Sequence, residues 1–433
     1  MIWNKEAECM SREQLRELQG KRLRNVVENV YKNTPFYRRK MDEIGVKPED
    51  INSIDDITKL PFTTKTDLRD NYPFGLCAVP MKDIVRVHAS SGTTGKPTVV
   101  GYTRNDLEAW ADCLARSFTA YGATKNDFFH ISYGYGLFTG GLGAHYGAEK
   151  IGASVIPMSS GNTDKQILLM HDFGSSVLCC TPSYALFIAD KIKESGYPRN
   201  EFKLKIGAFG AEPWTEQMRT ELQEKLGIKA YDIYGLSEIA GPGVGFECEN
   251  QNGTHLNEDH YFPEIINPVT FEPMKEGETG ELVFTHLTKE GMPLLRYRTK
   301  DLTALHFDKC SCGRTLVRMD RILGRSDDMM IIRGVNVFPS QIESVILKMD
   351  EFAPQYKIFV DRINNLDIME VWVEVREEYF TDELSKMLAM KKKLSSAIHS
   401  VLGIAVDIKL VEPNSIERSE GKAKRVFDKR IFK

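Results

Sequence analysis

The chain has 433 residues, of which 42% are hydrophobic and 27% are charged, an ordinary globular composition with room for two or three domains. The formal net charge of −4 argues against a nucleic-acid-binding surface, which needs clustered Lys and Arg. Eight cysteines are too few for a disulfide framework, and no segment has the apolar length of a signal peptide or a membrane span. We therefore expect a cytoplasmic protein with no nucleic-acid partner and no membrane partner.

An amphipathic helix is expected from residue 11 to about residue 32. Ser11 and Gln14 have the spacing of a capping box, in which each side chain accepts a hydrogen bond from a free backbone N–H at the helix start. The apolar residues that fit one helical face are Leu15, Leu18, Val26, Val27 and Val30.

From about residue 84 to residue 285, short apolar segments alternate with segments of helical periodicity. The expected strands are residues 85–90, 128–132, 154–158, 176–181, 205–209, 229–234 and 281–285. The expected helices are residues 105–120, 163–173, 183–194 and 215–226. This alternation predicts a wound α/β sheet, and ligands bind such sheets beyond the carboxyl ends of the strands.

The pattern changes after about residue 328. The expected elements there are helices at 340–348 and 381–401 and strands at 357–360, 370–375 and 404–411. They predict a small, mobile α+β domain of residues 327–433, which is large enough to fold as a unit of its own. Residues 1–326 then form a large multi-stranded wound α/β domain.

A loop rich in Gly, Ser and Thr follows the first expected strand. It offers backbone N–H groups, hydroxyl donors and one cation, which together suit a phosphate. Its residues are Ser90, Ser91, Gly92, Thr93, Thr94, Gly95 and Lys96. It is not a Walker loop, because that pattern needs glycine in place of Ser90 and Ser or Thr in place of Pro97. An ordinary polar loop has the same composition, so this loop alone does not decide the function.

Four further motifs follow this loop in order along the chain. They are Tyr234–Glu238, Tyr297–Asp301, Gly324–Asp328 and Arg418–Arg425. The ordered set resembles the adenylate-forming superfamily, which contains the acyl-CoA synthetases, the luciferases and the adenylation domains of peptide synthetases. Three more segments are similar to those of the phenylacetate–coenzyme A ligase family: Tyr133–Gly141, Gly210–Trp214 and Ile332–Ser340. The resemblance extends over roughly the full chain.

The resemblance implies ATP-dependent ligation of an arylacetic acid, with phenylacetate favoured, to coenzyme A through an acyl-adenylate. AMP and pyrophosphate would be released, Mg²⁺ would accompany ATP, and the protein would be a homodimer. Indoleacetate and a hydroxylated analogue stay open as substrates. Two other functions also stay open: an adenylate-forming enzyme with a different acid or a non-CoA acceptor, and a nucleotide-binding regulator without catalysis.

Activating a carboxylic acid with ATP requires cations and N–H donors, because the carboxylate and the triphosphate repel each other in a water-poor site. The resemblance implies that the loop from Ser90 to Lys96 holds the β- and γ-phosphates. Glu238, just past an expected strand and a turn glycine, is the candidate ligand of Mg²⁺. This ion prefers oxygen ligands.

The resemblance also assigns residues to the nucleoside. Asp301 is expected to accept hydrogen bonds from the ribose hydroxyls, and Arg325 is expected near the ribose and the α-phosphate. Lys300 departs from the family pattern, because many relatives have glycine there. The residues expected around the adenine are Gly210, Ala211, Glu212, Pro213, Asp232, Ile233 and Tyr234.

Lys422 is the expected catalytic residue. It follows a glycine in the charged C-terminal segment, and its side chain would bridge the carboxylate and the α-phosphate as charge shifts. Lys424 is the alternative. Asp327 and Asp328 are the expected hinge, because the resemblance implies that the C-terminal domain rotates between adenylation and thioester formation.

An aromatic segment with interleaved glycines is expected to bind the acid. Glycines let a ligand approach the backbone, and pockets for aromatic ligands are largely apolar. The expected pocket residues are Tyr133, Tyr135, Gly136 and Phe138 on one wall and Ile239, Ala240 and Pro242 on the other.

Three cysteines and a histidine form a separate candidate site for structural zinc. Cys248 and His255 are seven positions apart in a polar loop, and Cys310 and Cys312 form a tight knuckle. Three thiolates and an imidazole match a zinc ligand set, although the knuckle spacing is shorter than usual. Four unrelated side chains are the alternative.

Overall fold

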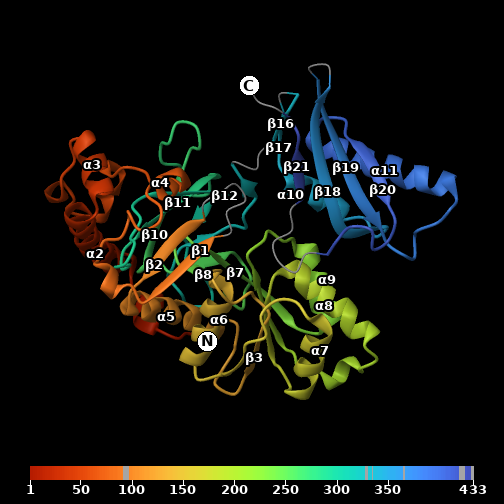
Figure 1. The fold of residues 1–433 in the computed structure, drawn as a ribbon, viewed down its shortest axis with the longest axis horizontal. Coiled ribbons are helices and arrows are strands. Elements are labelled where there is room, and N and C mark those ends of the chain that lie inside the picture. Colours follow the sequence, from red (N-terminus) through yellow and green to blue (C-terminus); the bar gives the residue numbers. More distant parts are fainter. Residues whose placement is uncertain (91–96, 327–329, 334, 364–365, 419–424, 431–433) are drawn as a thin grey trace. The chain divides into compact units, whose positions relative to one another are not determined.

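The computed structural model describes residues 1–90, 97–326, 330–333, 335–363, 366–418 and 425–430 (Figure 1). The chain divides into two compact units. The first unit comprises Met1–Ala211 and Leu222–Arg321, and the second comprises Glu212–Glu221 and Ile322–Lys433. The division expected after residue 326 stays a prediction.

The chain begins with helices that belong to the first unit. Their bounds are α1 (Lys5–Glu8), α2 (Arg12–Asn33), α3 (Pro35–Glu43) and α4 (Lys65–Asp70). Helix α2 confirms the expected N-terminal helix, and both halves of the Ser11–Gln14 capping box are present. Leu15, Val26 and Val30 lie on its buried face.

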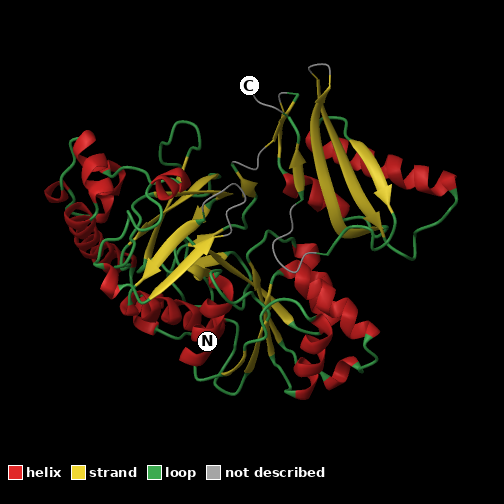
Figure 2. Cartoon of the chain, viewed as in Figure 1, coloured by secondary structure: helices red, strands yellow, loops and turns green. Residues whose placement is uncertain are grey.

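A mixed sheet forms the centre of the first unit and confirms the expected wound α/β class (Figure 2). Its described strand order is β13-β14-β9-β8-β7-β6-β5-β3-β4. Strands β4, β3, β5, β6 and β7 run parallel, and the remaining neighbours pair antiparallel. The bounds are β3 (Phe128–Ile131), β4 (Ser154–Ile156), β5 (Val177–Cys180), β6 (Ile206–Gly210), β7 (Lys229–Leu236), β8 (Gly241–Glu247), β9 (Thr254–Leu256), β13 (Leu305–His306) and β14 (Arg318–Met319).

One helix precedes β3, and a helix follows each of β3, β4, β5 and β6 along the chain. They are α5 (Arg104–Ala120), α6 (Thr139–Lys150), α7 (Thr163–Asp172), α8 (Pro182–Glu194) and α9 (Glu216–Leu226). Helix α6 was not expected, because it is rich in glycine. Its glycines allow close packing on α5: a Cβ atom at Gly147 would lie 2.2 Å from Cβ of Leu114. Among the helices that the structure describes, none combines the length and the apolar character needed to cross a bilayer.

Two expected strands lie outside the wound sheet. The strand expected at 85–90 is β1 (Arg86–Ser90), which pairs only with β2 (Thr98–Tyr102) within the described part of the chain. The strand expected at 281–285 is β11 (Gly280–His286), which pairs antiparallel with β10 (Tyr261–Ile266) and β12 (Tyr297–Thr303). Their inclusion in the wound sheet was wrong, because an apolar segment predicts a strand but not its partner.

The second unit is an α+β domain, as expected from the sequence. Its described elements are β15 (Gly324–Arg325), β16 (Met330–Ile332), β17 (Val335–Val337), α10 (Pro339–Ile346), β18 (Phe352–Ile363), β19 (Leu366–Val375), α11 (Leu384–Leu402), β20 (Asp407–Val411) and β21 (Val426–Asp428). The sheet order β20-β19-β18-β21 places the long β18–β19 hairpin at its centre. Side chains of this hairpin pack with Ile342, Leu394 and Ile398 in an apolar core.

Candidate active site

The predicted site residues of the first unit lie where the parallel strands end. Tyr133 follows β3, Gly210 ends β6, and Glu238 comes two residues after the end of β7. These three strands run in the same direction, because β3 pairs parallel with β5, β5 with β6 and β6 with β7. The carboxyl edge of a wound sheet is where such folds bind ligands, so the topology gathers these residues at one edge.

Tyr234 and Asp301 are joined by a direct hydrogen bond. The Tyr234 phenol donates to Oδ2 of Asp301 over 2.6 Å. Asp301 lies in β12, and its backbone N–H donates to the hydroxyl of Thr299. Both Tyr234 and Asp301 are half-buried, so the pair combines a ring with an anchored carboxylate.

The remaining residues expected around the adenine differ in burial and in backbone conformation. Gly210 pairs with Ile233 across β6 and β7, and a Cβ atom at Gly210 would lie 2.1 Å from the Ile233 carbonyl oxygen. Ala211 is exposed and has φ +71°, so the chain turns sharply there. The side chain of Ile233 is buried, whereas Asp232 and Tyr234 lie on the opposite face of β7 and are half-buried.

Three predicted nucleotide residues belong to the second unit. Glu212 and Pro213 lie in its Glu212–Glu221 segment, and Arg325 lies in β15. Arg325 is half-buried, and Gly324 before it has φ +156°. A Cβ atom at Gly324 would lie 3.0 Å from the Phe338 ring, so this approach favours glycine.

Glu238 is buried and paired with a lysine that the sequence analysis missed. Only 6% of Glu238 is exposed, and its Oε1 lies 3.2 Å from Nζ of Lys65. Lys65 is the first residue of α4, whose start is fixed by the Thr64–Asp67 capping box. The Thr-x-x-Asp spacing signals this helix start, but nothing local indicates that Lys65 meets Glu238.

His286 and Lys289 both donate to the carbonyl oxygen of Ile239, next to Glu238. His286 Nε2 lies 2.7 Å and Lys289 Nζ lies 2.9 Å from this oxygen. Nδ1 of His286 accepts from the Leu294 N–H, so the ring is held as the neutral Nε2–H tautomer. Burial keeps the pKa of His286 well below its ordinary value. Both donors were missed, because their partner is a backbone atom distant in sequence.

Lys289 is a fully buried cation beside this turn. Its Nζ lies 4.1 Å from the centre of the Tyr102 ring. Burial lowers the pKa of Lys289 to about 8, although the negative charges of Asp106 and Glu238 oppose this. Asp106 itself accepts from the backbone N–H groups of Glu290 and Gly291.

The expected acid-binding segment is tied to β1. The Leu137 carbonyl oxygen accepts from the backbone N–H of Ala89 over 2.9 Å and lies 3.0 Å from Nδ1 of His88. The segment therefore follows the strand that leads into the expected phosphate loop. Gly136 has φ +124°, which favours glycine there.

The aromatic residues of this segment differ in exposure. Tyr133 is buried, and its phenol donates to the Ala208 carbonyl oxygen over 3.4 Å. Tyr135 is half-buried, its Oη lies 3.2 Å from Nδ1 of His145, and burial raises the pKa of its phenol. Phe138, directly before α6, is 41% exposed.

The other expected wall is the turn from β7 into β8. Ile239 and Ala240 are buried. The Pro242 carbonyl oxygen accepts from Nε1 of Trp110 over 2.8 Å. A Cβ atom at Gly143 would lie 2.5 Å from the Trp110 ring and 2.9 Å from Pro242, so α6 packs directly on this turn.

Part of the predicted site cannot be placed. Ser91, Gly92, Thr93, Thr94, Gly95, Lys96, Asp327, Asp328 and Lys422 lie outside the residues that the structure describes. Ser90 pairs with Thr98 at the end of the β1–β2 hairpin where β1 ends and β2 begins. Its hydroxyl is buried and has no hydrogen-bond partner among the described residues.

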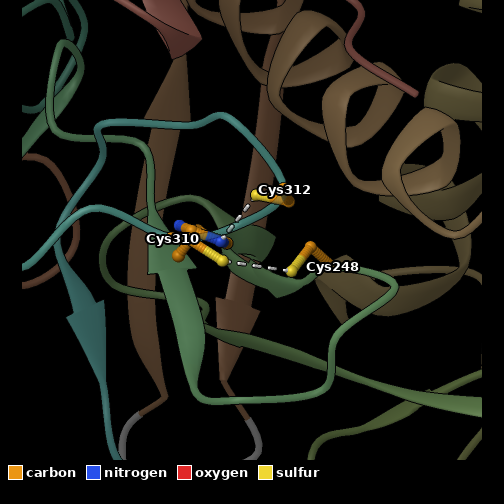
Figure 3. A group of neighbouring side chains, drawn as sticks. Cys248, Cys310 and Cys312 are labelled. Atoms are coloured by element: carbon orange, nitrogen blue, oxygen red, sulfur yellow. Dashed lines mark hydrogen bonds between the residues drawn. The ribbon is translucent and has the colours of Figure 1, made fainter.

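The predicted zinc ligands converge in the first unit (Figure 3). Sγ of Cys248 lies 3.8 Å from Sγ of Cys310, and Sγ of Cys312 lies 3.5 Å from Nε2 of His255. All four ligand atoms lie within 4.8 Å of one another. The four residues are therefore not unrelated side chains, and they form a compact sulfur–nitrogen cluster.

Comparisons with known proteins agree with the resemblance. The model of the AMP-binding enzyme family matches residues 7–287, and that of the AMP-binding enzyme C-terminal domain matches residues 334–430. Phenylacetate-coenzyme A ligase of Thermus thermophilus is 50% identical, covering 99% of this chain and 100% of that protein. The Escherichia coli protein of the same name is 52% identical, covering 98% and 97%.

A solved structure supports the same assignment. The crystal structure of 2-hydroxyisobutyryl-CoA ligase in the postadenylation state, in complex with 2-HIB-AMP, is 30% identical with a TM-score of 0.93. The match covers 99% of this chain and 92% of that one. The chain therefore belongs to the AMP-binding enzyme family, within its phenylacetate–coenzyme A ligase group.

Proposed function

We propose that the protein ligates phenylacetate to coenzyme A with ATP, through a bound phenylacetyl-adenylate, and releases AMP and pyrophosphate. The observation that carries this proposal is the match of about half of all residues to phenylacetate-coenzyme A ligases over nearly the whole chain. The chain is accordingly an AMP-forming acid–thiol ligase, and the choice of phenylacetate rests on those relatives.

The nucleoside is proposed to bind at the Tyr234–Asp301 pair. The hydrogen bond between them places a stacking ring beside a carboxylate that can accept from ribose hydroxyls. The turn at Ala211 is exposed and has a positive φ, so its backbone is accessible to a ligand. Arg325 is proposed to approach the ribose and the α-phosphate.

Glu238 is proposed to hold Mg²⁺ with ATP. A carboxylate is the donor type that this ion prefers, and Glu238 is buried with Lys65 as its ion-pair partner, which would compete with the ion there. Mg²⁺ would supply positive charge to the phosphates. The buried hydroxyl of Ser90 lies directly before the loop proposed to hold the β- and γ-phosphates.

The acid is proposed to bind between the 133–138 segment and the β7–β8 turn. One side offers the Tyr135 and Phe138 rings, and the other offers the apolar turn of Ile239 and Ala240. Such a pocket suits an aryl ring. Lys422 is proposed to stabilise the charge that develops between the carboxylate and the α-phosphate, and Asp327 and Asp328 to act as the hinge.

A panel assay tests the proposal. Pyrophosphate and AMP release would be measured with phenylacetate, indoleacetate, a hydroxylated phenylacetate, benzoate and a straight-chain acid, each with and without coenzyme A. We expect phenylacetate to give the highest kcat/KM and a CoA thioester to form only when coenzyme A is present. Asp301→Asn should lose most activity, whereas Glu249→Gln, an exposed residue after β8, should keep it.

Each other result would indicate a different function. Adenylation without consumption of coenzyme A would indicate another acceptor, and preference for another acid would overturn the substrate. ATP binding without turnover of any acid would indicate a nucleotide-binding regulator.

A homodimer and a cytoplasmic location also belong to the proposal, since the resemblance implies both. Light scattering on the purified chain would test the dimer, and fractionation of the producing cells would test the location.

A further inference from the structure

Three cysteines and one histidine meet in the first unit, away from the residues proposed to bind ATP and the acid. Cys248 follows β8, His255 lies in β9, and Cys310 and Cys312 lie in the turn between β13 and β14. Strands β8, β9 and β14 are neighbours in the sheet, with His255 opposite Phe246 on one side and Arg318 on the other. Strand pairing therefore brings together ligands that are far apart in the sequence.

Two of the ligand–ligand distances match the edges of a tetrahedral zinc site, and all four ligand atoms lie within 4.8 Å of one another. With zinc–sulfur and zinc–nitrogen bonds of about 2.3 and 2.05 Å, the tetrahedral edges are about 3.8 Å between two sulfurs and about 3.6 Å between sulfur and nitrogen. The observed Cys248–Cys310 and Cys312–His255 distances are 3.8 and 3.5 Å. A disulfide would need about 2.0 Å between sulfurs, so Cys248 and Cys310 are free thiols at the spacing of two ligands of one ion.

Hydrogen bonds from neighbouring residues orient the candidate ligands for a metal. Nδ1 of His255 lies 3.3 Å from the Leu316 carbonyl oxygen, so its proton can be donated there while the lone pair of Nε2 points toward the thiols. The Asn250 amide donates to Sγ of Cys310 over 3.5 Å. Backbone turns close at Cys248, whose carbonyl accepts from the Gln251 N–H, and at Cys310, whose carbonyl accepts from the Gly313 N–H.

A buried cation also lies beside the cluster. Three thiolates and one dication carry a net charge of −1, and the buried guanidinium of Arg314 interacts with Cys312. Arg314 also pairs with Glu8 over 2.6 Å. Arg314 therefore lies between the cluster and the Glu8 carboxylate, and sulfur-rich sets with one imidazole favour zinc over harder ions.

We propose that Cys248, His255, Cys310 and Cys312 bind one Zn²⁺ ion in a closed structural site. The site fastens the 307–317 turn to the β8–β9 hairpin. The 307–317 turn also holds the N-terminal segment. Arg314 donates to the Met1 carbonyl over 2.7 Å, and Thr315 donates to the Met10 carbonyl over 2.5 Å. Zinc therefore stabilises the contacts that hold α1 and the N-terminal segment, and it has no part in the ligation chemistry.

Metal analysis of the untagged full-length protein tests this proposal. We expect about one zinc per chain in the wild type and almost none in Cys312→Ser. The matched control is Cys77→Ser, a half-buried cysteine whose nearest sulfur is that of Met81 at 3.9 Å, and it should keep its zinc. Full zinc in Cys312→Ser, or no zinc in the wild type, overturns the site.

A second measurement uses only the wild type, in case Cys312→Ser does not fold. Zinc would be removed with a chelator and replaced by Co²⁺, and we expect the thiolate charge-transfer and tetrahedral d–d absorption of a cysteine-rich site. Removal should also speed proteolysis of residues 1–10, with recovery when zinc is added back. An intact mass two hydrogens lighter, caused by a Cys248–Cys310 disulfide in the freshly purified protein, would overturn the proposal.

Discussion

Tyr234 donates a hydrogen bond of 2.6 Å to Oδ2 of Asp301, a residue 67 positions away in a different sheet. Because the acceptor is charged, this bond is roughly twice as strong as one between neutral groups. It holds ring and carboxylate together before a nucleotide arrives. The pair therefore reduces the ordering that nucleotide binding would otherwise require.

The Tyr234→Phe variant distinguishes the contribution of the ring from that of the hydrogen bond. Stacking on adenine is retained, but Asp301 loses a bond of a type that contributes about 1.5–3 kcal/mol. We expect the KM for ATP to rise by about tenfold, with a smaller change in kcat. AMP release at varied ATP measures this, and Tyr197→Phe, whose ring stacks on His171, is the control. An unchanged KM would show that the bond does not position the nucleotide.

The sequence predicted the residues of this pair but not their contact. Tyr234 begins one short motif and Asp301 ends another, and motif order identified both. The hydrogen bond depends on how β7 and β12 lie in two separate sheets. Lys65 and Lys289 were missed for the same reason, since each acts through a partner that is distant in the sequence, 50 positions away for Lys289 and farther for Lys65.

The fold was predictable where local periodicity is strong. Helix α2 and the parallel strands β3 to β7 were expected from apolar spacing. Helix α6 was not, because Gly143 and Gly147 lower its helix propensity, yet both allow the close approach of α5. Tertiary packing, rather than local helix propensity, therefore explains why this segment is helical.

Lys65→Met is expected to strengthen Mg²⁺ binding. Lys65 lies 3.2 Å from Oε1 of Glu238 and competes with any cation at this carboxylate. Removing that competition should lower the half-saturating Mg²⁺ concentration by about threefold to tenfold, given the strength of such pairs near a protein surface. Adenylation at fixed ATP and varied Mg²⁺ measures it. Lys59→Met, from the Lys59–Asp56 surface pair, should leave the value unchanged, and an unchanged value in Lys65→Met would remove Glu238 as the ligand.

Lys289 should make the stability of the first unit rise with pH. Burial lowers its pKa from the ordinary 10.5 to about 8. Below pH 8 both the folded and the unfolded chain carry the proton, so the cost of burying the charge is fully present. Between pH 8 and pH 10.5 the folded state has lost the proton and the unfolded state has kept it, so the free energy of unfolding rises with pH.

The test compares wild type with Lys289→Met. From pH 7 to pH 10, the free energy of unfolding of the wild type should rise by about 2–3 kcal/mol relative to the variant. Urea unfolding of both proteins at several pH values measures the difference. Lys193→Met removes an exposed lysine of α8 and should show no such trend. A constant difference for Lys289→Met would mean that Lys289 keeps its proton throughout.

Lys300 occupies a backbone conformation that favours glycine. Its φ is +70°, where a residue with a side chain is strained by about 1 kcal/mol. Lys300→Gly should leave the unfolding free energy unchanged or raise it by up to about 1 kcal/mol. Glu281 keeps its bidentate pair with Arg298 in this variant. Lys300→Val should be less stable than wild type, since branched residues rarely adopt this φ; equal stability of the two variants would contradict the strain.

Lys422→Ala should separate the two half-reactions. If this cation acts only as the carboxylate attacks the α-phosphorus, its removal should slow acid-dependent pyrophosphate release by about 10²–10³. Thioester formation from supplied phenylacetyl-adenylate and coenzyme A should continue at nearly the wild-type rate, because that step needs no such bridge. Lys424→Ala is the matched control, two positions away in the same segment, and should keep both rates. The reverse pattern would make Lys424 the catalytic residue, and equal loss of both half-reactions in Lys422→Ala would mean that this segment supports the fold of the second unit instead.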